Sequence, residues 1–192
     1  DSHAKHNTTS VYTSGDIFPM LPEKLSTDLT SLGEGQDRLA IVVELVVAED
    51  GSVLSSTLFR AIVHNHAKLA YNSVSQWLTG SEPAPERVMA VPGLDAQLRL
   101  QSRVAQRLKA RRHRQGALSL ETIEPRAVFE GEVLTGLRVE QKNRAKELIE
   151  DFMIAANQAT VSYLKGKGIP SFRRILRSPE RWQRIIEVAA RW

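Results

Sequence analysis

Two apolar segments separated by a tight-turn signal constrain the fold more than any other feature of the sequence. Residues 38–48 read RLAIVVELVVA and residues 52–64 read SVLSSTLFRAIVH, with Glu49-Asp50-Gly51 between them. Val, Ile and Thr favour strands, because their branched side chains pack well on a pleated surface. A short Asp-Gly turn joins neighbouring antiparallel strands. The sequence therefore predicts an antiparallel hairpin over residues 38–64.

Helical patterns follow this hairpin. Apolar residues recur at roughly helical spacing in residues 94–115 and 143–165, and a shorter helix is predicted over residues 69–78. Residues 79–92 hold three prolines and a glycine and are predicted to form a loop. Pro179 follows a serine that can cap a helix, so a last helix is predicted to start at Ser178.

Shorter pieces complete the expected architecture. Residues 1–15 are polar, residues 17–22 read as an extended segment because of their two prolines, and residues 23–32 read as a short turn of helix. Strand-like pieces occur in residues 117–139, where Gly131 is expected to turn the last two strands. Strands followed by helices predict the α+β class, with an antiparallel or mixed sheet and packed helices.

Charge is distributed unevenly along the chain. Residues 16–50 hold eight acids and two bases, residues 99–114 hold seven bases and no acid, and residues 165–192 hold eight bases and two acids. Such asymmetry points to a polyanionic partner such as nucleic acid, and the alternative is a solvated helix face. Aromatic rings beside basic segments can stack on bases, and the candidates are Tyr12, Tyr71, Phe129, Phe172 and Trp182. Packing in the core is the favoured alternative for Phe129 and Trp182.

Several kinds of chemistry are excluded or weak. The absence of cysteine excludes disulfides, thiolate nucleophiles and cysteine-based metal sites, and it is compatible with a reducing compartment. No apolar run is long enough to span a membrane, and the serine-hydrolase and phosphate-loop motifs are absent.

Metal sites have little support among the residues themselves. Glu49-Asp50 is expected to be solvated, and Glu150 and Asp151 would point about 100° apart on a helix, so at most one could face a given site. The pair His64 and His66 lacks a third ligand.

Longer motifs add a resemblance. Ser10-Val11-Tyr12 is followed by IFPMLPEKLS at residues 17–26, HAKLAY at 66–71, RQGAL at 114–118 and LIEDFMIAAN at 148–157. In this order the motifs resemble the ribonuclease II/ribonuclease R (RNB) family of exoribonucleases. The resemblance covers residues 1 to about 179.

The resemblance implies that residues 1–192 are an interior part of a single RNB-like catalytic domain. It implies a processive 3′→5′ exoribonuclease that hydrolyses single-stranded RNA to nucleoside 5′-monophosphates with Mg²⁺. By this resemblance, Tyr12 matches the tyrosine that stacks on a base near the 3′ end, and Tyr71 matches the tyrosine beside the scissile phosphate. Glu150 matches the glutamate that contacts the terminal sugar. Arg174 matches an RNA-binding arginine. A cytoplasmic monomer without a membrane partner is expected, completed by the remaining segments of the same enzyme.

Departures from the family pattern leave a second hypothesis open. Leu120 and Leu176 stand where the family has phenylalanine and histidine. The family's metal-binding aspartates are expected before residue 1, so Mg²⁺ is expected to be bound outside this segment and the segment alone to be inactive. The flanking cold-shock and S1 RNA-binding domains are also not in this chain. The alternative is a catalytically inactive RNA-binding module on the same scaffold.

Overall fold

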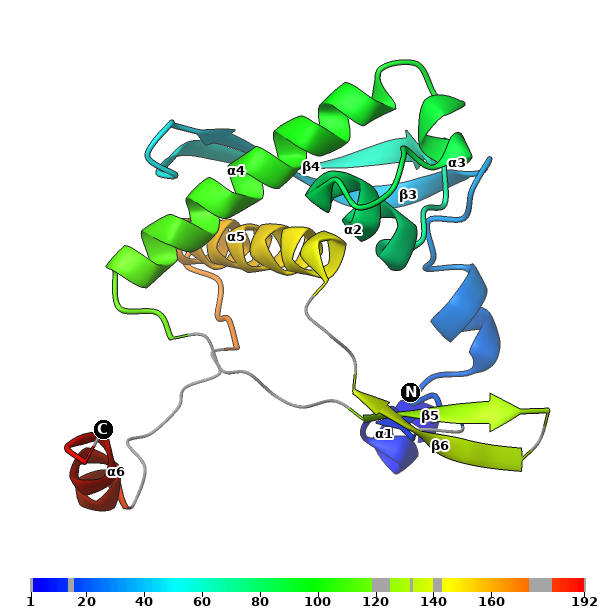
Figure 1. Ribbon diagram of the computed structural model, residues 1–192. Coiled ribbons are helices and arrows are strands. Elements are labelled where there is room, and N and C mark those ends of the chain that lie inside the picture. Colours follow the sequence, from blue (N-terminus) through cyan, green and yellow to red (C-terminus); the bar gives the residue numbers. More distant parts are fainter. Residues whose placement is uncertain are drawn as a thin grey trace. The chain divides into compact units, whose positions relative to one another are not determined.

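The computed structural model describes residues 2–13, 16–118, 125–131, 133–139, 143–172 and 181–191 (Figure 1). The chain forms two compact units, residues 1–160 and 161–192, and the helix α5 continues across that boundary. The described elements confirm the α+β class, and their strands form two-stranded antiparallel sheets. In chain order they are α1 (Ser2–Asn7), β1 (Val11–Tyr12), β2 (Ile17–Phe18), the short π-helical turn η1 (Lys24–Asp28), β3 (Asp37–Val47), β4 (Val53–His64), α2 (Tyr71–Thr79), α3 (Glu86–Met89), α4 (Leu94–Arg114), β5 (Pro125–Glu130), β6 (Val133–Val139), α5 (Arg144–Gly166) and α6 (Trp182–Ala189).

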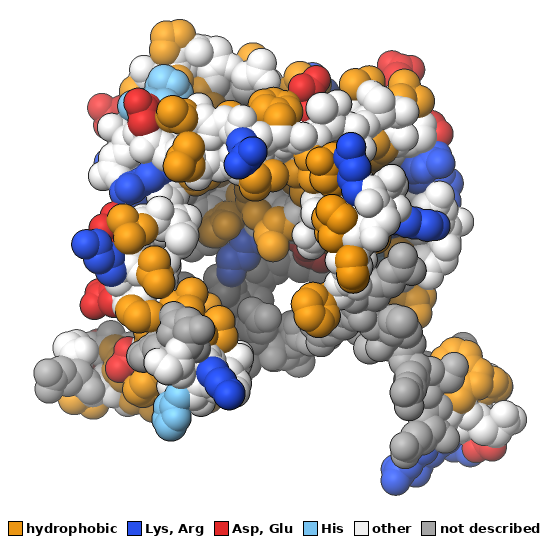
Figure 2. All heavy atoms as spheres, turned by 180° about the vertical axis from the view of Figure 1, so that it is seen from behind, with side chains coloured by type: hydrophobic (Ala, Val, Ile, Leu, Met, Phe, Trp, Pro, Cys, Tyr) orange, Lys and Arg blue, Asp and Glu red, His pale blue; other side chains and the backbone are white. Residues whose placement is uncertain are grey.

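The predicted hairpin is confirmed. Strands β3 and β4 pair antiparallel, with Leu39 opposite Ile62 and Val43 opposite Leu58, and a bulge follows Val46. Side chains along β3 largely alternate between exposed and half-buried, as a strand with one covered face requires. Hydrophobic side chains also lie at the molecular surface (Figure 2), and Leu39 and Ile62 are among the most exposed of them.

The turn between β3 and β4 is docked on α4. Gly51 is buried at a φ of +84°, and a Cβ built on it would lie 2.3 Å from the Arg107 carbonyl oxygen. Arg111 donates a hydrogen bond to the Asp50 carboxylate at 2.8 Å, and Arg114 donates to the Asp50 carbonyl at 2.7 Å. The prediction that Glu49-Asp50 lies at the solvated surface is confirmed, since both residues are exposed, and Asp50 in addition binds two arginines of a helix distant in sequence.

The main hydrophobic cluster lies where α2, α3, α4 and the start of α5 meet. Its buried members are Val74, Trp77, Val88, Leu98 and Ala145. The loop predicted over residues 79–92 is wrong in part, since α3 lies within it and carries Val88, which is fully buried. Pro85 precedes α3 and its carbonyl accepts the Val88 N–H, so a proline counted as a helix breaker here stands at a helix start.

Helices α4 and α5 run in the same direction (Figure 1), and long polar side chains join them. Arg144 donates to the Ser102 carbonyl at 2.7 Å, Lys109 pairs with Glu147 at 2.8 Å, and Arg112 pairs with Asp151 at 2.7 Å. Along these three contacts the residue numbers increase on both helices, so the two helices are parallel.

The basic run of α4 is therefore largely committed to the fold. Five of its seven bases bind groups of the same chain: Arg99 over the Trp77 ring, Lys109, Arg111, Arg112 and Arg114. The bases in the last turn also face the negative end of the helix dipole. Arg99, Arg103, Arg107 and Arg114 are nevertheless exposed, so part of this segment is the solvated helix face that the sequence left open.

The ends of the described chain differ from the sequence prediction in detail. Helix α1 lies within the polar stretch for which no helix was predicted. Strands β5 and β6 confirm the predicted pair around Gly131. Residues 119–120 of the first strand-like piece and the predicted helix start at Ser178 lie outside the described residues.

The prediction that Phe129 and Trp182 pack in the core is wrong, because both side chains are about half exposed.

The helices give no sign of a membrane segment. Among the residues that the structure describes, no helix is both long enough and apolar enough to cross a bilayer.

Replacing Gly51 by alanine should destabilise the protein more than the matched change Gly80→Ala. Gly80 has a φ of +82° but open space around its Cβ position, so it reports the left-handed backbone cost alone, about 1–2 kcal/mol. Gly51→Ala adds a clash with the α4 backbone, typically about 1–3 kcal/mol more. Urea unfolding of both variants measures the difference, and equal losses would contradict the docking of the turn on α4.

Acidification should weaken the junction of α4 and α5. Burial alone would raise the pKa of the Glu147 carboxyl, but hydrogen bonds and charge from Lys109 and Arg144 lower it below its ordinary 4.5. A lowered folded-state pKa contributes stability that is present above 4.5 and lost as the pH falls through the folded-state value.

The variant Glu147→Gln should thus be less stable than the wild type at neutral pH, and the difference should shrink as the pH falls below 4.5. Melting temperatures across this range check the prediction. Glu49→Gln is the control, because Glu49 forms no ion pair with the residues described. A gap that stays constant with pH would contradict the assignment.

Candidate functional site

Tyr12 lies on a small hairpin that is fastened on both sides of it. It pairs with Ile17 across β1 and β2, and its side chain is 74% exposed. Beyond it, the Thr13 N–H donates to the Asp16 carbonyl and the Asp16 N–H donates to the Thr13 hydroxyl, both at 2.9 Å. Before it, the Met20 N–H donates to the Ser10 hydroxyl at 2.9 Å. The backbone around the ring is thus held while the ring itself stays accessible.

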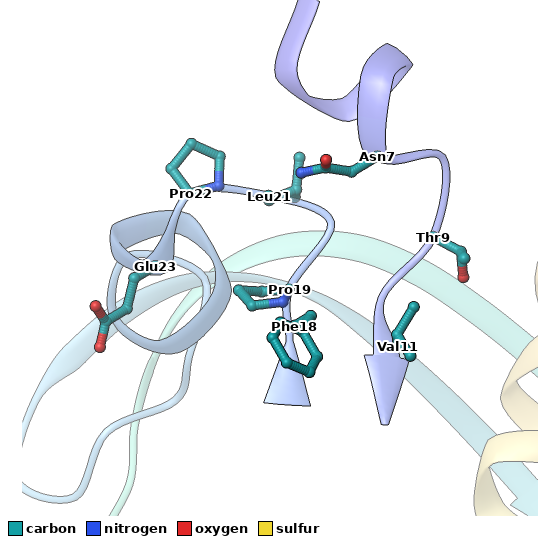
Figure 3. A pocket seen from close by; sticks show the side chains of 8 residues that line it. All are labelled: Asn7, Thr9, Val11, Phe18, Pro19, Leu21, Pro22 and Glu23. Atoms are coloured by element: carbon teal, nitrogen blue, oxygen red, sulfur yellow. The ribbon is translucent and has the colours of Figure 1, made fainter. Parts of the chain in front are cut away.

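A hollow of about 420 Å³ opens beside this hairpin (Figure 3). Figure 3 shows around it side chains from the end of α1 and the segment that follows, from β1, and from the stretch between Phe18 and Glu23. The lining is mostly apolar and comprises Asn7, Thr9, Val11, Phe18, Pro19, Leu21, Pro22 and Glu23. The rigid prolines expected to form an extended segment therefore shape one wall of this hollow.

Tyr71 is the first residue of α2 and is about half exposed. Its neighbour Asn72 accepts a hydrogen bond from the Asn143 amide at 2.9 Å, and Ser75 accepts one from the Arg144 N–H. These contacts attach the start of α5 to the helix that begins with Tyr71. Two stretches of the sequence that carry separate motifs therefore adjoin in the fold.

Glu150 and Asp151 point in different directions from α5, as the helical spacing predicted. Glu150 is exposed, whereas Asp151 is 2% exposed and accepts a hydrogen bond from Arg112. Asp151 shares the buried stripe of Leu148 and Ala155. Asp151 occupies an apolar position of the helical pattern, which is a sequence signal for a buried ion pair. The sequence did not indicate its partner, because Arg112 is one of many bases in α4.

The contacts of the described residues do not bring the predicted site residues together. Among the described residues, no hydrogen bond, ion pair or ring contact joins the side chains of Tyr12, Tyr71 and Glu150. Arg174 lies outside the described residues, as do Leu120 and Leu176.

No metal centre forms in the part of the chain that is described. His64 and His66 lie with ring centroids 4.9 Å apart, and His64 Nδ1 is 2.7 Å from an Asp37 carboxylate oxygen. Within the described ranges, no group of three His, Cys, Asp or Glu side chains is arranged to hold a cation. The described residues therefore contain no cluster that fits a magnesium site.

Comparison with known proteins identifies a family that the chain matches. Residues 1–190 match the RNB domain family. Ribonuclease R of Vibrio parahaemolyticus is 34% identical over 180 residues, which cover 93% of this chain and 21% of that protein. Exoribonuclease 2 of Cronobacter sakazakii is 35% identical over 173 residues, or 87% of this chain and 26% of that protein.

Solved structures agree with the sequence comparison. The RNase R of Mycoplasma genitalium in complex with ribose-methylated single-stranded RNA is 26% identical with a TM-score of 0.85, and the match covers 100% of this chain and 30% of that one. The same protein in complex with double-stranded RNA gives a TM-score of 0.84.

The curated relatives are much longer than this chain, which spans about a fifth to a quarter of the length of those named above. The family match nevertheless covers nearly every residue here, in agreement with the motifs noted in the sequence. The chain belongs to the RNB domain family.

Proposed function

We propose that this chain is part of a 3′→5′ exoribonuclease that hydrolyses single-stranded RNA processively to nucleoside 5′-monophosphates. The observation that carries the proposal is the family match over residues 1–190, supported by identities of 34–35% to a ribonuclease R and an exoribonuclease 2. The complex of the Mycoplasma genitalium relative with single-stranded RNA supports that substrate class. The chain is proposed to be an interior part of one RNB-like catalytic domain, in a cytoplasmic and monomeric enzyme.

In the proposed enzyme, Mg²⁺ is bound by residues outside this chain. The described residues lack a cluster of ligands for it, so we assign its ligands to segments outside this chain. Bound there, Mg²⁺ would stabilise the charge that develops on the phosphate during hydrolysis.

The residues of this chain are proposed to hold the RNA rather than the metal. The exposed ring of Tyr12, on its fastened hairpin, suits stacking on a base, which tolerates any sequence because every base has a π-face. The Tyr71 phenol is proposed to lie by the scissile phosphate, and the exposed Glu150 carboxylate to accept hydrogen bonds from the terminal ribose. A contact with the 2′-OH distinguishes RNA from DNA. Arg174 is proposed as a further RNA contact.

The alternative is an inactive RNA-binding module, which the departures from the family pattern at Leu120 and Leu176 favour. Incubating the whole protein with a uniformly labelled RNA separates the two. Stepwise release of monophosphates that stops with EDTA supports the nuclease, whereas RNA binding without products supports the module.

Replacing Tyr12 by alanine in the whole enzyme should lengthen the final product by one or more nucleotides. One stacked base is worth about 1–3 kcal/mol, a loss that short RNAs feel more than long ones with many phosphate contacts. End products are resolved on a sequencing gel. Tyr12→Phe, which keeps the ring, should retain the wild-type length.

Tyr163→Ala is the matched control, because Tyr163 is another exposed tyrosine outside the motifs. If Tyr12 only packs the hairpin, the alanine variant will have a lower melting temperature and an unchanged product, which would retire the stacking role.

Replacing Glu150 by alanine should slow turnover while RNA binding stays nearly intact. An interaction with the terminal sugar acts on the reacting end, and most of the affinity comes from the rest of the strand. Single-turnover rates and filter-binding affinities measured on the same protein check this. Unchanged rates would show that Glu150 is an ordinary surface acid.

A further inference from the structure

The buried pair Arg112–Asp151 needs an explanation beyond stability. Asp151 is 2% exposed and the Arg112 side chain 19% exposed, and their nitrogen and oxygen lie 2.7 Å apart. Arg112 Nη1 and Asp151 Oδ2 are also buried and find no hydrogen-bond partner among the described residues. Moving two charges out of water costs more free energy than an ion pair with incomplete hydrogen bonding commonly recovers. Apolar residues of similar size often stabilise a core better. The surrounding stripe of α5 is apolar, so a hydrophobic pair would suit the site chemically.

The pair does define the rotation of α5 about its own axis. Arg144, Glu147 and Asp151 lie at i, i+3 and i+7, which is one face of a helix, and each contacts α4. Arg112 provides the last of these contacts. Glu150 precedes Asp151 by one residue, so the two side chains leave the helix in directions about 100° apart. A fixed direction for Asp151 therefore fixes the direction of Glu150.

The anchor itself is held from the other side. Arg111, next to Arg112, binds the Asp50 carboxylate in the β3–β4 turn, and the Gly51 backbone packs on α4 one turn earlier. The C-terminal part of α4 is thereby held between the hairpin and α5. A rotation of α5 would have to break a buried charged contact, which is costly because each charge would be left unpaired.

We propose that Arg112 and Asp151 are positioning residues that aim Glu150 at the 3′-terminal sugar of the RNA. This inference rests on the proposed function, in which Glu150 contacts that sugar. Neither Arg112 nor Asp151 contacts the RNA in this scheme. Both act through the direction of α5, and a displacement of about 1 Å at a reacting group can cost roughly 100-fold in rate.

A double-mutant cycle in the whole enzyme tests the proposal. The variants are Asp151→Asn, Glu150→Ala and the combination, assayed with an RNA and with the same RNA carrying a 2′-deoxy sugar at its 3′ end. Asp151→Asn should lower kcat about 10- to 100-fold with KM nearly unchanged, and it should weaken discrimination between the two substrates. In the Glu150→Ala background, Asp151→Asn should have almost no further effect, because the group that it aims is gone.

Two controls separate positioning from folding. The pair Arg112→Met with Asp151→Leu replaces the charges by apolar side chains, which should keep the melting temperature near that of the wild type but still lower kcat. Gly80→Ala reduces stability at the end of α2 without changing a contact between α4 and α5, and it should retain the preference for a terminal ribose.

The outcomes distinguish the two levels of the proposal. If Glu150→Ala lowers kcat but the folded Met/Leu variant turns over like the wild type, or if the Asp151 and Glu150 effects multiply, the positioning role is overturned and the proposed function stands. If Glu150→Ala leaves turnover and sugar discrimination unchanged, the proposed role of Glu150 fails, and the positioning role fails with it.

Discussion

The attachment of the C-terminal half of α4 to its two neighbours is the constraint on which the rest of the structure depends. On one side, Gly51 allows the β3–β4 turn to approach the Arg107 carbonyl, and Arg111 and Arg114 bind Asp50. On the other side, Lys109 and Arg112 bind Glu147 and Asp151 of α5. The hairpin and α5 contact the same helix through charged groups, and this joins segments that lie about a hundred residues apart in the sequence.

This use of charge changes the interpretation of the basic composition. A formal net charge of +4 and a run of seven bases suggest a surface for nucleic acid. Four of those bases pair with acids of the same chain or pack on a ring, so much of the run also stabilises the fold. The groups proposed to contact RNA are instead the exposed Tyr12 ring and the exposed Glu150 carboxylate.

The proposed division of labour follows from what the chain contains. The described residues supply rings, amides and carboxylates suited to bases and sugars, and they form no cluster suited to a cation. The matched segments make up only 21% and 26% of the two relatives named above. A hydrolase assembled from several segments can hold its substrate with one and its metal with another, provided that rigid contacts such as those of α4 set their geometry.

The sequence by itself determined the elements whose signals are local. Branched residues around Asp50-Gly51 predicted the β3–β4 hairpin, helical spacing predicted α4 and α5, and ordered motifs indicated the family. The same signals missed α3, where prolines resembled a loop, and misjudged Phe129 and Trp182, because apolar character alone does not say what covers a side chain.

Only the tertiary structure decided which charges meet. The partners Asp50–Arg111 and Asp151–Arg112 are 61 and 39 residues apart. No local pattern encodes such a pairing, because it depends on how the helices pack rather than on the spacing within either one. The tertiary structure likewise decided that Asp151 is buried and Glu150 exposed, since the sequence showed that the two diverge but not which of them faces the core.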